Sequence, residues 1–461
     1  MSLTGRATRV AAIVAVLLAF TAVAAWAHAR LVRSDPPKDA RLVWQPNVIR
    51  LEFSEAVAAV TSRVELVAPD SQRRSLGVRG DSLGNRKVLL ADVPPLPSSG
   101  SYRVEWRLIG PDGHAVSGNY SFSVDSIVRR QSVNPVDSAP RRTASPRSVI
   151  VAPDSRLQQV TRFLWILALL VVLGSTSLSL AVLPRVRGNG AESGREFQEG
   201  MTGPLRSWIG IGAWVLLILA FVRLTSQALV LSGSQAIRVS DVTGIVVGST
   251  WGRGWLVFVA ATIAILVFSR ASKRTPIRST WPKIAGACAL LAIASPFLGH
   301  PAATDVAPLA MSMDALHVLA AGGWGGTLLM LALVGIPRIT EVERDQRATI
   351  LQTLLRAFSP VALSCAAVLV ITGAVEAWLQ LGSVSALWNS EYGTALVRKL
   401  VFVMLVAALG AYHWRFAQPA LTTDRSLTAL RWSIALDVVF LLGVLVLTAI
   451  LTGTAPPAGA A

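Results

Sequence analysis

The chain has 461 residues, of which 52% are hydrophobic and 15% charged, and its formal net charge is +17 at pH 7. This composition excludes a single soluble domain and predicts a membrane protein whose first third is exported. The basic residues lie mostly in short loops between apolar runs, where they orient helices, so the charge does not indicate nucleic acid binding. Cys288 and Cys365 both fall inside apolar runs, which argues against a disulfide framework in the exported part.

Residues 1–27 have the pattern of a bacterial signal peptide, with a basic start, an apolar run over 10–25 and an Ala-x-Ala cleavage site at 25–27. Cleavage at this site makes His28 the N-terminal residue. The α-amino nitrogen and the imidazole of such a histidine can hold one metal ion as a chelate, and the low basicity of an α-amine limits proton competition. The alternative is an uncleaved signal anchor, in which His28 is an ordinary exposed histidine.

The segment 28–124 alternates short β-rich runs with turn signals and shows no helical period, which predicts a small all-β sandwich of the immunoglobulin-like type. The segment 125–157 is rich in Pro, Ser and Arg and is predicted to be a flexible linker. The predicted strands cover 48–53, 63–67, 87–90, 102–107 and 120–124.

A second group of metal-ligating residues, Asp112-Gly113-His114, lies in the loop before the last predicted strand. Together with an N-terminal histidine, these side chains give three nitrogens and one oxygen, a set that suits tetragonal Cu(II). The spacing is also compatible with a simple turn, in which the aspartate caps its own backbone.

Five motifs follow one another in the exported part: His28-Ala29, Ser34-Asp35-Pro36, Leu51-Glu52-Phe53-Ser54-Glu55, Tyr102-Arg103-Val104-Glu105-Trp106-Arg107 and Asp112-Gly113-His114 with Ser117-Gly118. Their order resembles the CopC family of periplasmic copper-binding proteins. The resemblance implies that His28, Asp112 and His114 bind Cu(II), with Glu55 at or beside the site. Some members carry a second, Met- and His-rich Cu(I) site, whereas residues 56–113 contain neither residue type, so a single Cu(II) site is expected.

Eight apolar stretches after the linker are each long enough to span a bilayer, which predicts a polytopic bundle of eight transmembrane helices over 158–455. The loops on one side carry most of the Arg and Lys residues, whereas the loops on the other side carry only Arg238. By the positive-inside rule, the sandwich and the C-terminus lie outside the plasma membrane. The stretches are 160–183, 207–232, 253–269, 281–299, 313–336, 358–381, 393–414 and 432–452.

The apolar region contains several distinctive runs, namely Asp314-Ala315-Leu316-His317 with Trp324-Gly325-Gly326, Phe358-Ser359-Pro360-Val361-Ala362, Leu369-Val370-Ile371-Thr372-Gly373, and the runs 392–399 and 447–457. By these runs the region resembles the CopD family of copper-resistance membrane proteins, most closely over the last 150 residues or so. The two families also occur fused in this order in copper-uptake proteins of the YcnJ type.

A copper path inside the membrane needs thioether and imidazole donors, which Cu(I) prefers. His317, Met313 and Met311 lie near the outer end of the fifth span and His300 near that of the fourth. Asp314, three residues before His317, is expected to orient its ring. Packing at the membrane interface is the alternative role for the methionines.

These observations predict a bacterial plasma-membrane protein of copper homeostasis, which binds Cu(II) outside and moves copper, as Cu(I) in the bundle, across the lipid bilayer, in the inward direction. The sequence contains neither a P-loop nor a CxxC pair, which argues against a pumping ATPase. Further partners would be a periplasmic copper chaperone or reductase. Two alternatives remain open: a copper-dependent oxidase that uses the histidine brace, and a haem-dependent electron carrier with paired histidines.

Overall fold

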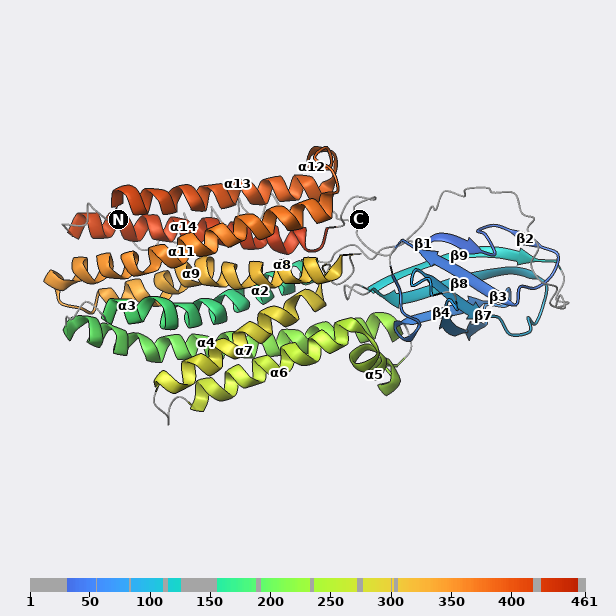
Figure 1. The fold of residues 1–461 in the computed structure, drawn as a ribbon. Coiled ribbons are helices and arrows are strands. Elements are labelled where there is room, and N and C mark those ends of the chain that lie inside the picture. The colour runs from blue at the N-terminus through green and yellow to red at the C-terminus, as the bar shows by residue number, and fades with distance from the viewer. Residues whose placement is uncertain are drawn as a thin grey trace, which may run out of the picture.

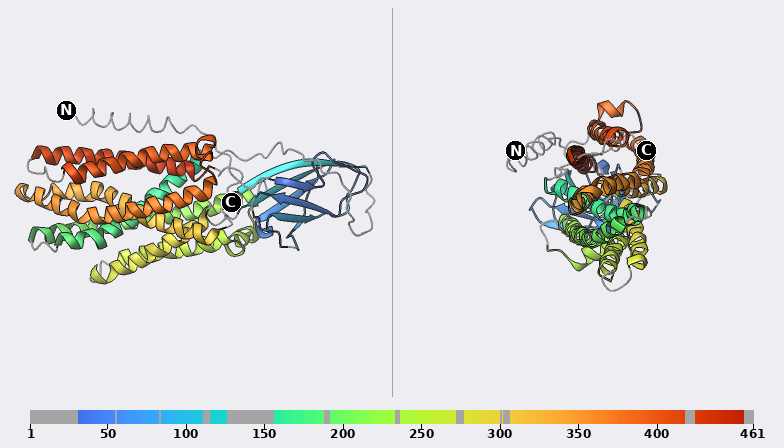
Figure 2. Two further views of the ribbon diagram at one scale, coloured as in Figure 1. Left: turned by 45° about the horizontal axis from the view of Figure 1, so that its top comes forward. Right: turned by 90° about the vertical axis from the view of Figure 1, so that its left-hand side faces the viewer.

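The computed structural model describes residues 31–54, 56–82, 84–110, 115–125, 156–187, 192–232, 236–271, 277–299, 301, 306–417 and 424–454. A β-sheet domain comes first in the chain and a long bundle of helices follows it (Figure 1). The β-domain lies beyond one end of the bundle, in line with the helix axes (Figure 2).

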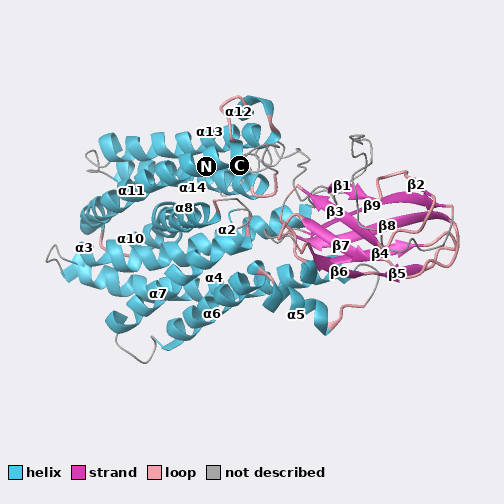
Figure 3. Cartoon of the chain, turned by 45° about the vertical axis from the view of Figure 1, so that its right-hand side comes forward, coloured by secondary structure: helices cyan, strands magenta, loops and turns pink. Residues whose placement is uncertain are grey.

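Two sheets form the β-domain, one with strand order β1-β3-β7-β6 and the other with β2-β9-β8-β4-β5 (Figure 3). Neighbouring strands are antiparallel except for β2 and β9. The predicted all-β sandwich is therefore confirmed. The strands are β1 Leu31–Asp35, β2 Arg41–Leu42, β3 Val48–Phe53, β4 Ser62–Val67, β5 Arg73–Ser75, β6 Gly77–Gly80, β7 Val88–Asp92, β8 Gly100–Ile109 and β9 Ala115–Val124.

The sandwich core follows from the two-residue period of its strands. Along β3, Ile49, Leu51 and Phe53 are buried and alternate with half-exposed residues. The ring of Phe53 lies 6.4 Å, edge to face, from the ring of Trp106 on β8 and so joins the two sheets. Gly118 on β9 is paired with Trp106, and a Cβ atom at Gly118 would lie 2.2 Å from the indole ring. The indole therefore fills the space that a side chain at this position would need.

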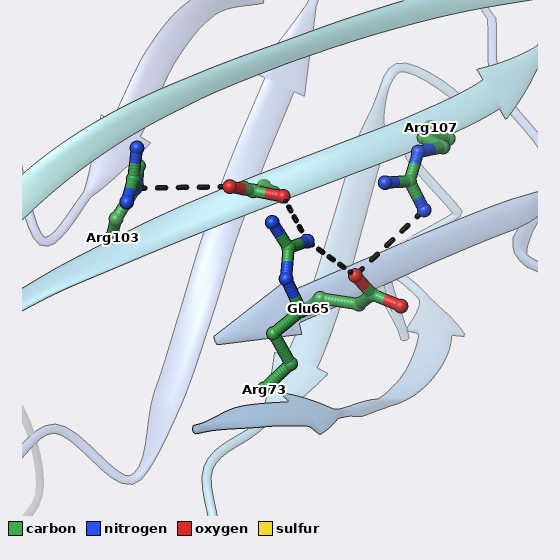
Figure 4. Close-up of polar contacts among 5 residues, drawn as sticks. Glu65, Arg73, Arg103 and Arg107 are labelled. Atoms are coloured by element: carbon green, nitrogen blue, oxygen red, sulfur yellow. Dashed lines mark hydrogen bonds and ion pairs between the residues drawn. The ribbon is translucent and has the colours of Figure 1, made fainter. Parts of the chain in front are cut away.

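One solvent-facing surface of the sandwich carries a network of charged side chains (Figure 4). Glu65 on β4 and Glu105 on β8 are directly opposite each other, an arrangement that is destabilising for like charges. Arg73 on β5 lies between them, with Nη1 2.7 Å from Glu105 and 3.4 Å from Glu65, and its hydrogen bond to Glu105 raises the pKa of its guanidinium. Arg107 and Arg103 add ion pairs of 3.7 Å to Glu65 and Glu105. The three arginines thus offset the repulsion between the two glutamates and hold β4, β5 and β8 together.

Among the described residues, eight helical segments are long and apolar enough to cross a membrane, which confirms the predicted number. Two short helices, α5 and α12, lie outside these segments. The helices are α2 Arg156–Ser177, α3 Leu183–Arg187, α4 Glu192–Ser232, α5 Val239–Gly248, α6 Thr250–Ala271, α7 Ile277–Ala294, α8 Ala307–Ala321, α9 Thr327–Met330, α10 Ile336–Ile339, α11 Arg344–Leu381, α12 Ala386–Asn389, α13 Glu391–Tyr412 and α14 Asp424–Leu451.

Two helices extend well beyond the predicted apolar stretches. The α4 helix begins at Glu192 and α11 at Arg344, whereas the predicted spans begin at 207 and 358. Both extensions carry charged residues, which lower the mean hydropathy and so hide the helix from a search for apolar runs. The apolar stretch therefore defines the span but not the helix.

The fifth span, Ala307–Ile339, contains π-helical turns at η5 Gly322–Gly326 and η6 Leu331–Gly335. The first π-helical turn packs closely on α2, since a Cβ atom at Gly174 would lie 2.1 Å from the carbonyl carbon of Gly326. Small residues permit such backbone contact between membrane helices. The remaining irregular helical segments are η1 Ala59–Thr61, η2 Leu178–Val182, η3 Ser295–Leu298 and η7 His413–Ala417.

Candidate functional site

The residues predicted to bind Cu(II) in the β-domain, His28, Glu55, Asp112 and His114, lie outside the described residues, as does His300 of the predicted membrane path. The structure therefore leaves these five assignments as predictions.

The described strand ends that flank the predicted Cu(II) ligands come close to one another. Leu31, three residues after His28, pairs with Phe53, and Ile109 pairs with Ala115 across the loop that contains Asp112 and His114. Phe53 contacts Trp106, which lies three residues before the end of β8. Residues that lie just beyond neighbouring strand ends can meet, so these pairings are consistent with one shared site.

His317 is the best-defined candidate ligand in the bundle. It lies on α8 and faces α11, where its Nδ1 is 2.9 Å from Oγ1 of Thr372. The Thr372 hydroxyl donates its single hydrogen to the carbonyl oxygen of Val368 at 2.8 Å. In the first bond Nδ1 is therefore the donor, and Nε2 is the ring nitrogen with a free lone pair. A metal-binding imidazole has this arrangement, one nitrogen held by a second group and the other available.

Three ionisable side chains surround His317 between α8, α11 and α13. Glu376 Oε2 lies 4.0 Å from His317 Nδ1, and Glu376 Oε1 is buried without a hydrogen-bond partner in the described part of the chain. Lys399 on α13 interacts electrostatically with both Glu376 and Asp314. Charged groups inside a membrane segment are costly and commonly mark ion pathways. The cluster lies in the half of the bundle nearest the β-domain, where α8 and α12 are drawn in Figure 1.

The orienting partner of His317 differs from the predicted one. Thr372, on a neighbouring helix, forms the hydrogen bond that the sequence analysis assigned to Asp314. The Asp314 carboxylate instead interacts with Lys399 and Glu376. The spacing of Asp314 and His317 puts them on one helix face but does not determine which side chain meets the ring.

The two predicted methionine ligands are half-buried on the same helix as His317. Met313 lies one turn before His317 and shares its face, whereas Met311 lies six residues before it. Within the described ranges, the structure contains no group of three or more His, Cys, Asp or Glu residues that could hold a metal ion. A copper ion at His317 would therefore need donors such as a thioether beside the imidazole.

The two cysteines have different surroundings. Cys288 is buried on α7, with Sγ 3.5 Å from Oγ1 of Thr176. Cys365 is half-buried on α11, and a Cβ atom at Gly323 of the η5 turn would lie 2.6 Å from its sulfur. Cys365 is seven residues from Thr372, about 10 Å along the same helix face. Only Cys365 therefore lies on the face of α11 that meets His317.

A second polar cluster lies at the far end of the bundle. His413 Nδ1 is 3.1 Å from Asp437 Oδ2, and His413 Nε2 is 2.7 Å from Ser433 Oγ. The Ser433 hydroxyl donates to the carbonyl oxygen of Leu430 at 2.9 Å, so Nε2 carries the hydrogen of its own bond. Both ring nitrogens are engaged, and no lone pair remains for a metal ion. The sequence provided no signal for Ser433, because small hydroxyl residues are common in apolar helices. Thr372 lies within the CopD-like motif 369–373, but the motif did not indicate its hydrogen bond to His317.

Arg223 in the second span has structural contacts. It donates to the carbonyl oxygen of Leu298 at 2.7 Å, and its guanidinium lies 5.2 Å from the centre of the Trp165 ring. The backbone acceptor near the end of η3 and the aromatic face together account for a charged residue in this span.

The fold defines a class: a multi-pass membrane protein in which a small β-sandwich precedes a bundle of eight apolar helices. Residues 31–125 match the CopC domain, residues 153–311 match the Copper resistance protein D-like N-terminal domain, and residues 352–451 match Copper resistance protein D. The chain belongs to the copper resistance and transport family in which CopC and CopD domains are joined in one polypeptide.

Characterised relatives cover both parts of the chain. Copper transport protein CutJ of Bacillus subtilis is 23% identical over 92% of this chain and 75% of its own length. Copper resistance protein D of Pseudomonas syringae pv. tomato is 28% identical over 53% of this chain and 82% of its own. Copper resistance protein C of Xanthomonas campestris pv. juglandis is 32% identical over 24% of this chain and 91% of its own. These names concern copper transport and resistance, in agreement with the copper prediction.

Solved structures similar to the chain include CopC from Methylosinus trichosporium OB3b, at 26% identity, with 23% of this chain and 99% of that chain covered and a TM-score of 0.20. PcoC from Escherichia coli, described as a methionine-rich copper resistance protein, is 27% identical over 22% of this chain and 100% of its own, with a TM-score of 0.19.

Proposed function

We propose that this protein captures copper with its β-sandwich and moves it through the helical bundle into the cell. The observation that carries the proposal is the geometry at His317 inside the bundle, where Thr372 holds Nδ1 and leaves Nε2 free, with Glu376 Oε2 4.0 Å from Nδ1. The copper transport protein CutJ, which aligns with 92% of the chain, supports the choice of copper as cargo.

In the sandwich we propose a single Cu(II) site formed by the amine and imidazole of His28 with Asp112 and His114, and with Glu55 at or beside it. An amine, two imidazoles and a carboxylate are donors that suit Cu(II). The methionine-rich relative PcoC provides the contrast, because the whole sandwich of this chain lacks methionine. Without thioether donors the domain is expected to bind Cu(I) weakly.

In the bundle we propose that copper travels as Cu(I). His317 Nε2 is the first ligand, and Met313 one turn earlier supplies a thioether on the same face. Met311 and His300 are the remaining candidates for the outer end of this path. The change from Cu(II) to Cu(I) needs one electron, which a separate reductase or a small-molecule reductant outside the membrane would donate.

We propose that the sandwich and the C-terminus lie outside and that copper moves inward. The Arg and Lys residues are concentrated in alternate loops, which supports this orientation. A high-affinity trap outside the bundle favours uptake, since an efflux protein gains nothing by rebinding its cargo on the far side.

The decisive experiment measures cellular copper accumulation over a range of external copper concentrations. We expect His317→Ala to abolish accumulation at every concentration, and His114→Ala to impair it mainly at scarce copper, because mass action can replace a trap but not a broken path. His413→Gln serves as the matched control in the same bundle. Normal accumulation in a His317→Ala protein present at wild-type membrane level would remove His317 from the path.

A titration of the isolated domain beginning at His28 tests the sandwich site. One extra residue before His28 converts the amine to an amide and removes one chelate ring, so Cu(II) affinity should fall on the order of 100-fold, about 3 kcal/mol. Equal affinity of the two proteins in a competition assay would exclude the brace.

The two alternative functions are addressed by the same purified protein. Peroxide-dependent oxidation of a substrate by the copper-loaded sandwich would indicate an enzyme. A Soret band would indicate a haem carrier, which needs histidines facing each other across the bundle. The histidine pair for such a site is His300 and His317, of which His300 lies outside the described residues. His413 is not a partner for His317, because Lys399 beside His317 is 14 residues, about 21 Å, from His413 along α13.

A further inference from the structure

The short helix α5, Val239–Gly248, is inserted between the spanning helices α4 and α6 and contacts the sandwich. Ten residues are too few to cross a bilayer. Figure 1 shows α5 at the end of the bundle that meets the β-domain. Its apolar side chains Val239 and Val247 are 81% and 71% exposed, as expected for a helix that lies at the membrane surface.

Asp241 near the start of α5 connects the two domains. Its Oδ2 accepts hydrogen bonds from the Arg238 amide at 3.1 Å and the Ser232 hydroxyl at 3.2 Å, which fix the carboxylate. Its Oδ1 accepts a hydrogen bond from Arg63 of β4 in the sandwich. The Asp241 side chain is only 6% exposed and that of Arg63 16%.

The charge of Asp241 is stabilised despite its burial. Burial alone raises the pKa of this carboxyl, but the hydrogen bonds from the Arg238 amide and the Arg63 guanidinium outweigh it and bring the pKa below its ordinary value. Removing either partner of such a partly buried, hydrogen-bonded pair is costly, because the remaining charge is left away from water without compensation.

The same face of α5 is shaped for a turn of the sandwich. Asp241, Gly244 and Gly248 are spaced by three and four residues and so share one face. A Cβ atom at Gly244 would lie 3.1 Å from the carbonyl oxygen of Val60, and one at Gly248 would lie 3.1 Å from the Val60 side chain. Val60 keeps 57% of its surface exposed, so it contacts the helix on one side only.

The end of β8 adds an apolar contact. Ile109 is 3% exposed and packs with the core of the bundle instead of the core of the sandwich. The hydroxyl of Thr61 donates to the Ile109 carbonyl oxygen at 3.1 Å, so η1 and the end of β8 form one edge. This edge, Val60 to Arg63 with Ile109, is the docking edge of the sandwich.

Charges within the sandwich favour the same contact. Arg63 stands directly opposite Arg107 in the register of β4 and β8, an unfavourable pairing of like charges. Arg107 is 3.7 Å from Glu65. The counter-charge closest to Arg63 is supplied by Asp241 of the bundle.

We propose that α5 is a docking element for the sandwich, which holds the β8–β9 end against the mouth of the bundle so that captured copper passes inward without release. The inference rests on the proposed function for its cargo, and on the described contacts alone for the docking itself. The linker keeps the domains in one chain, whereas α5 sets their orientation.

A disulfide between Val60→Cys and Gly248→Cys tests the docking in the full-length protein. The Cβ built at Gly248 lies 3.5 Å from the Val60 Cβ, within the range of disulfide geometry. In a background with both native cysteines changed to serine, mild oxidation of membranes should produce this bond rapidly. The matched control pairs Val60→Cys with Val239→Cys, at the other end of α5 and away from its docking face, and should react slowly.

Charge reversal links the disulfide to the ion pair. Arg63→Glu should slow disulfide formation at least about tenfold, equivalent to about 1.4 kcal/mol, and adding Asp241→Arg should restore it. Equal rates in the two cysteine pairs, or no rescue by the double reversal, would overturn the docking proposal.

Copper accumulation distinguishes a failure of docking from a failure of the proposed function. If the disulfide experiments give the expected rates, Arg63→Glu should reduce copper accumulation several-fold at scarce copper. The double variant Arg63→Glu with Asp241→Arg should restore it. If the disulfide forms as expected while the undocked variant accumulates copper normally, the transfer role of α5 is wrong. If the wild-type protein accumulates no copper, the proposed function fails and the docking result stands by itself.

Discussion

The two polar clusters of the bundle use histidine in opposite ways. At the end near the β-domain, His317 donates through Nδ1 to Thr372 and keeps Nε2 free, with Glu376 and Lys399 close by. At the far end, both nitrogens of His413 are hydrogen bonded. A histidine inside a membrane protein can thus keep one ring nitrogen available for a cation, or it can use both nitrogens to connect two helices. Its hydrogen bonds distinguish the two cases.

The largest expected effect falls on the group that orients the free nitrogen. Thr372→Val keeps the shape of the side chain but removes the hydroxyl, so Nδ1 loses its acceptor and either ring nitrogen can carry the hydrogen. Changes to such supporting groups cost about 10–100-fold in metal affinity, and copper accumulation should fall accordingly. Thr372→Ser retains the hydroxyl and should accumulate copper at close to the wild-type rate.

Wild-type copper accumulation by a stable Thr372→Val protein would contradict the role given to His317. It would show that copper transport does not depend on the ring orientation that the Thr372 hydrogen bond imposes.

A smaller effect, on stability instead of uptake, is expected at the other cluster. Asp437→Ala leaves His413 Nδ1 buried without its acceptor, which should lower the free energy of unfolding by about 3 kcal/mol. Asp437→Asn keeps an acceptor oxygen and should cost less. Thermal unfolding in detergent measures the difference, and copper accumulation per surviving molecule should be unchanged.

The opposite result would be an Asp437→Ala protein with full stability but no copper uptake. It would show that the cluster around His413 also belongs to the copper path.

The smallest effect is expected between the clusters. Cys365 lies about 10 Å below Thr372 on the same face of α11 and could accept copper from His317. Cys365→Ser should lower the accumulation rate a few-fold, whereas Cys288→Ser should leave it unchanged because Cys288 packs against Thr176 on another pair of helices. Equal rates for both serine variants, measured by copper uptake into cells, would show that the path leaves α11 above Cys365.

The sequence predicted what depends on length and composition and missed what depends on pairing between helices. Eight spans followed from apolar runs, and the two-layer sandwich followed from alternating strands. The bond from His317 to Thr372 could not be predicted, since it joins helices 55 residues apart. The contact of Arg63 with Asp241 joins residues 178 positions apart and gave no local signal either. The α5 helix has only ten residues and is apolar, so the sequence does not separate it from the apolar spans on either side.

The predictions for the exported copper ligands had a different basis. His28, Asp112 and His114 came from a cleavage pattern and from family motifs, and no packing rule applies to them. The pairings of Leu31 with Phe53 and of Ile109 with Ala115 bring together the strand ends beside these ligands.

The contact between Gly174 and Gly326 has a mechanical consequence. With two backbones in direct contact, no side chain can change rotamer to let the helices slide, so the first and fifth spans form a rigid frame. Their apolar segments are 67% and 72% buried, whereas those of the sixth and seventh spans are 22% and 17% buried. If the proposed transport involves a movement of helices, we expect α11 and α13, which bury the least surface, to move against this frame. Spin labels on α2 and α9 should keep their separation during transport, and a change there would contradict the rigid frame.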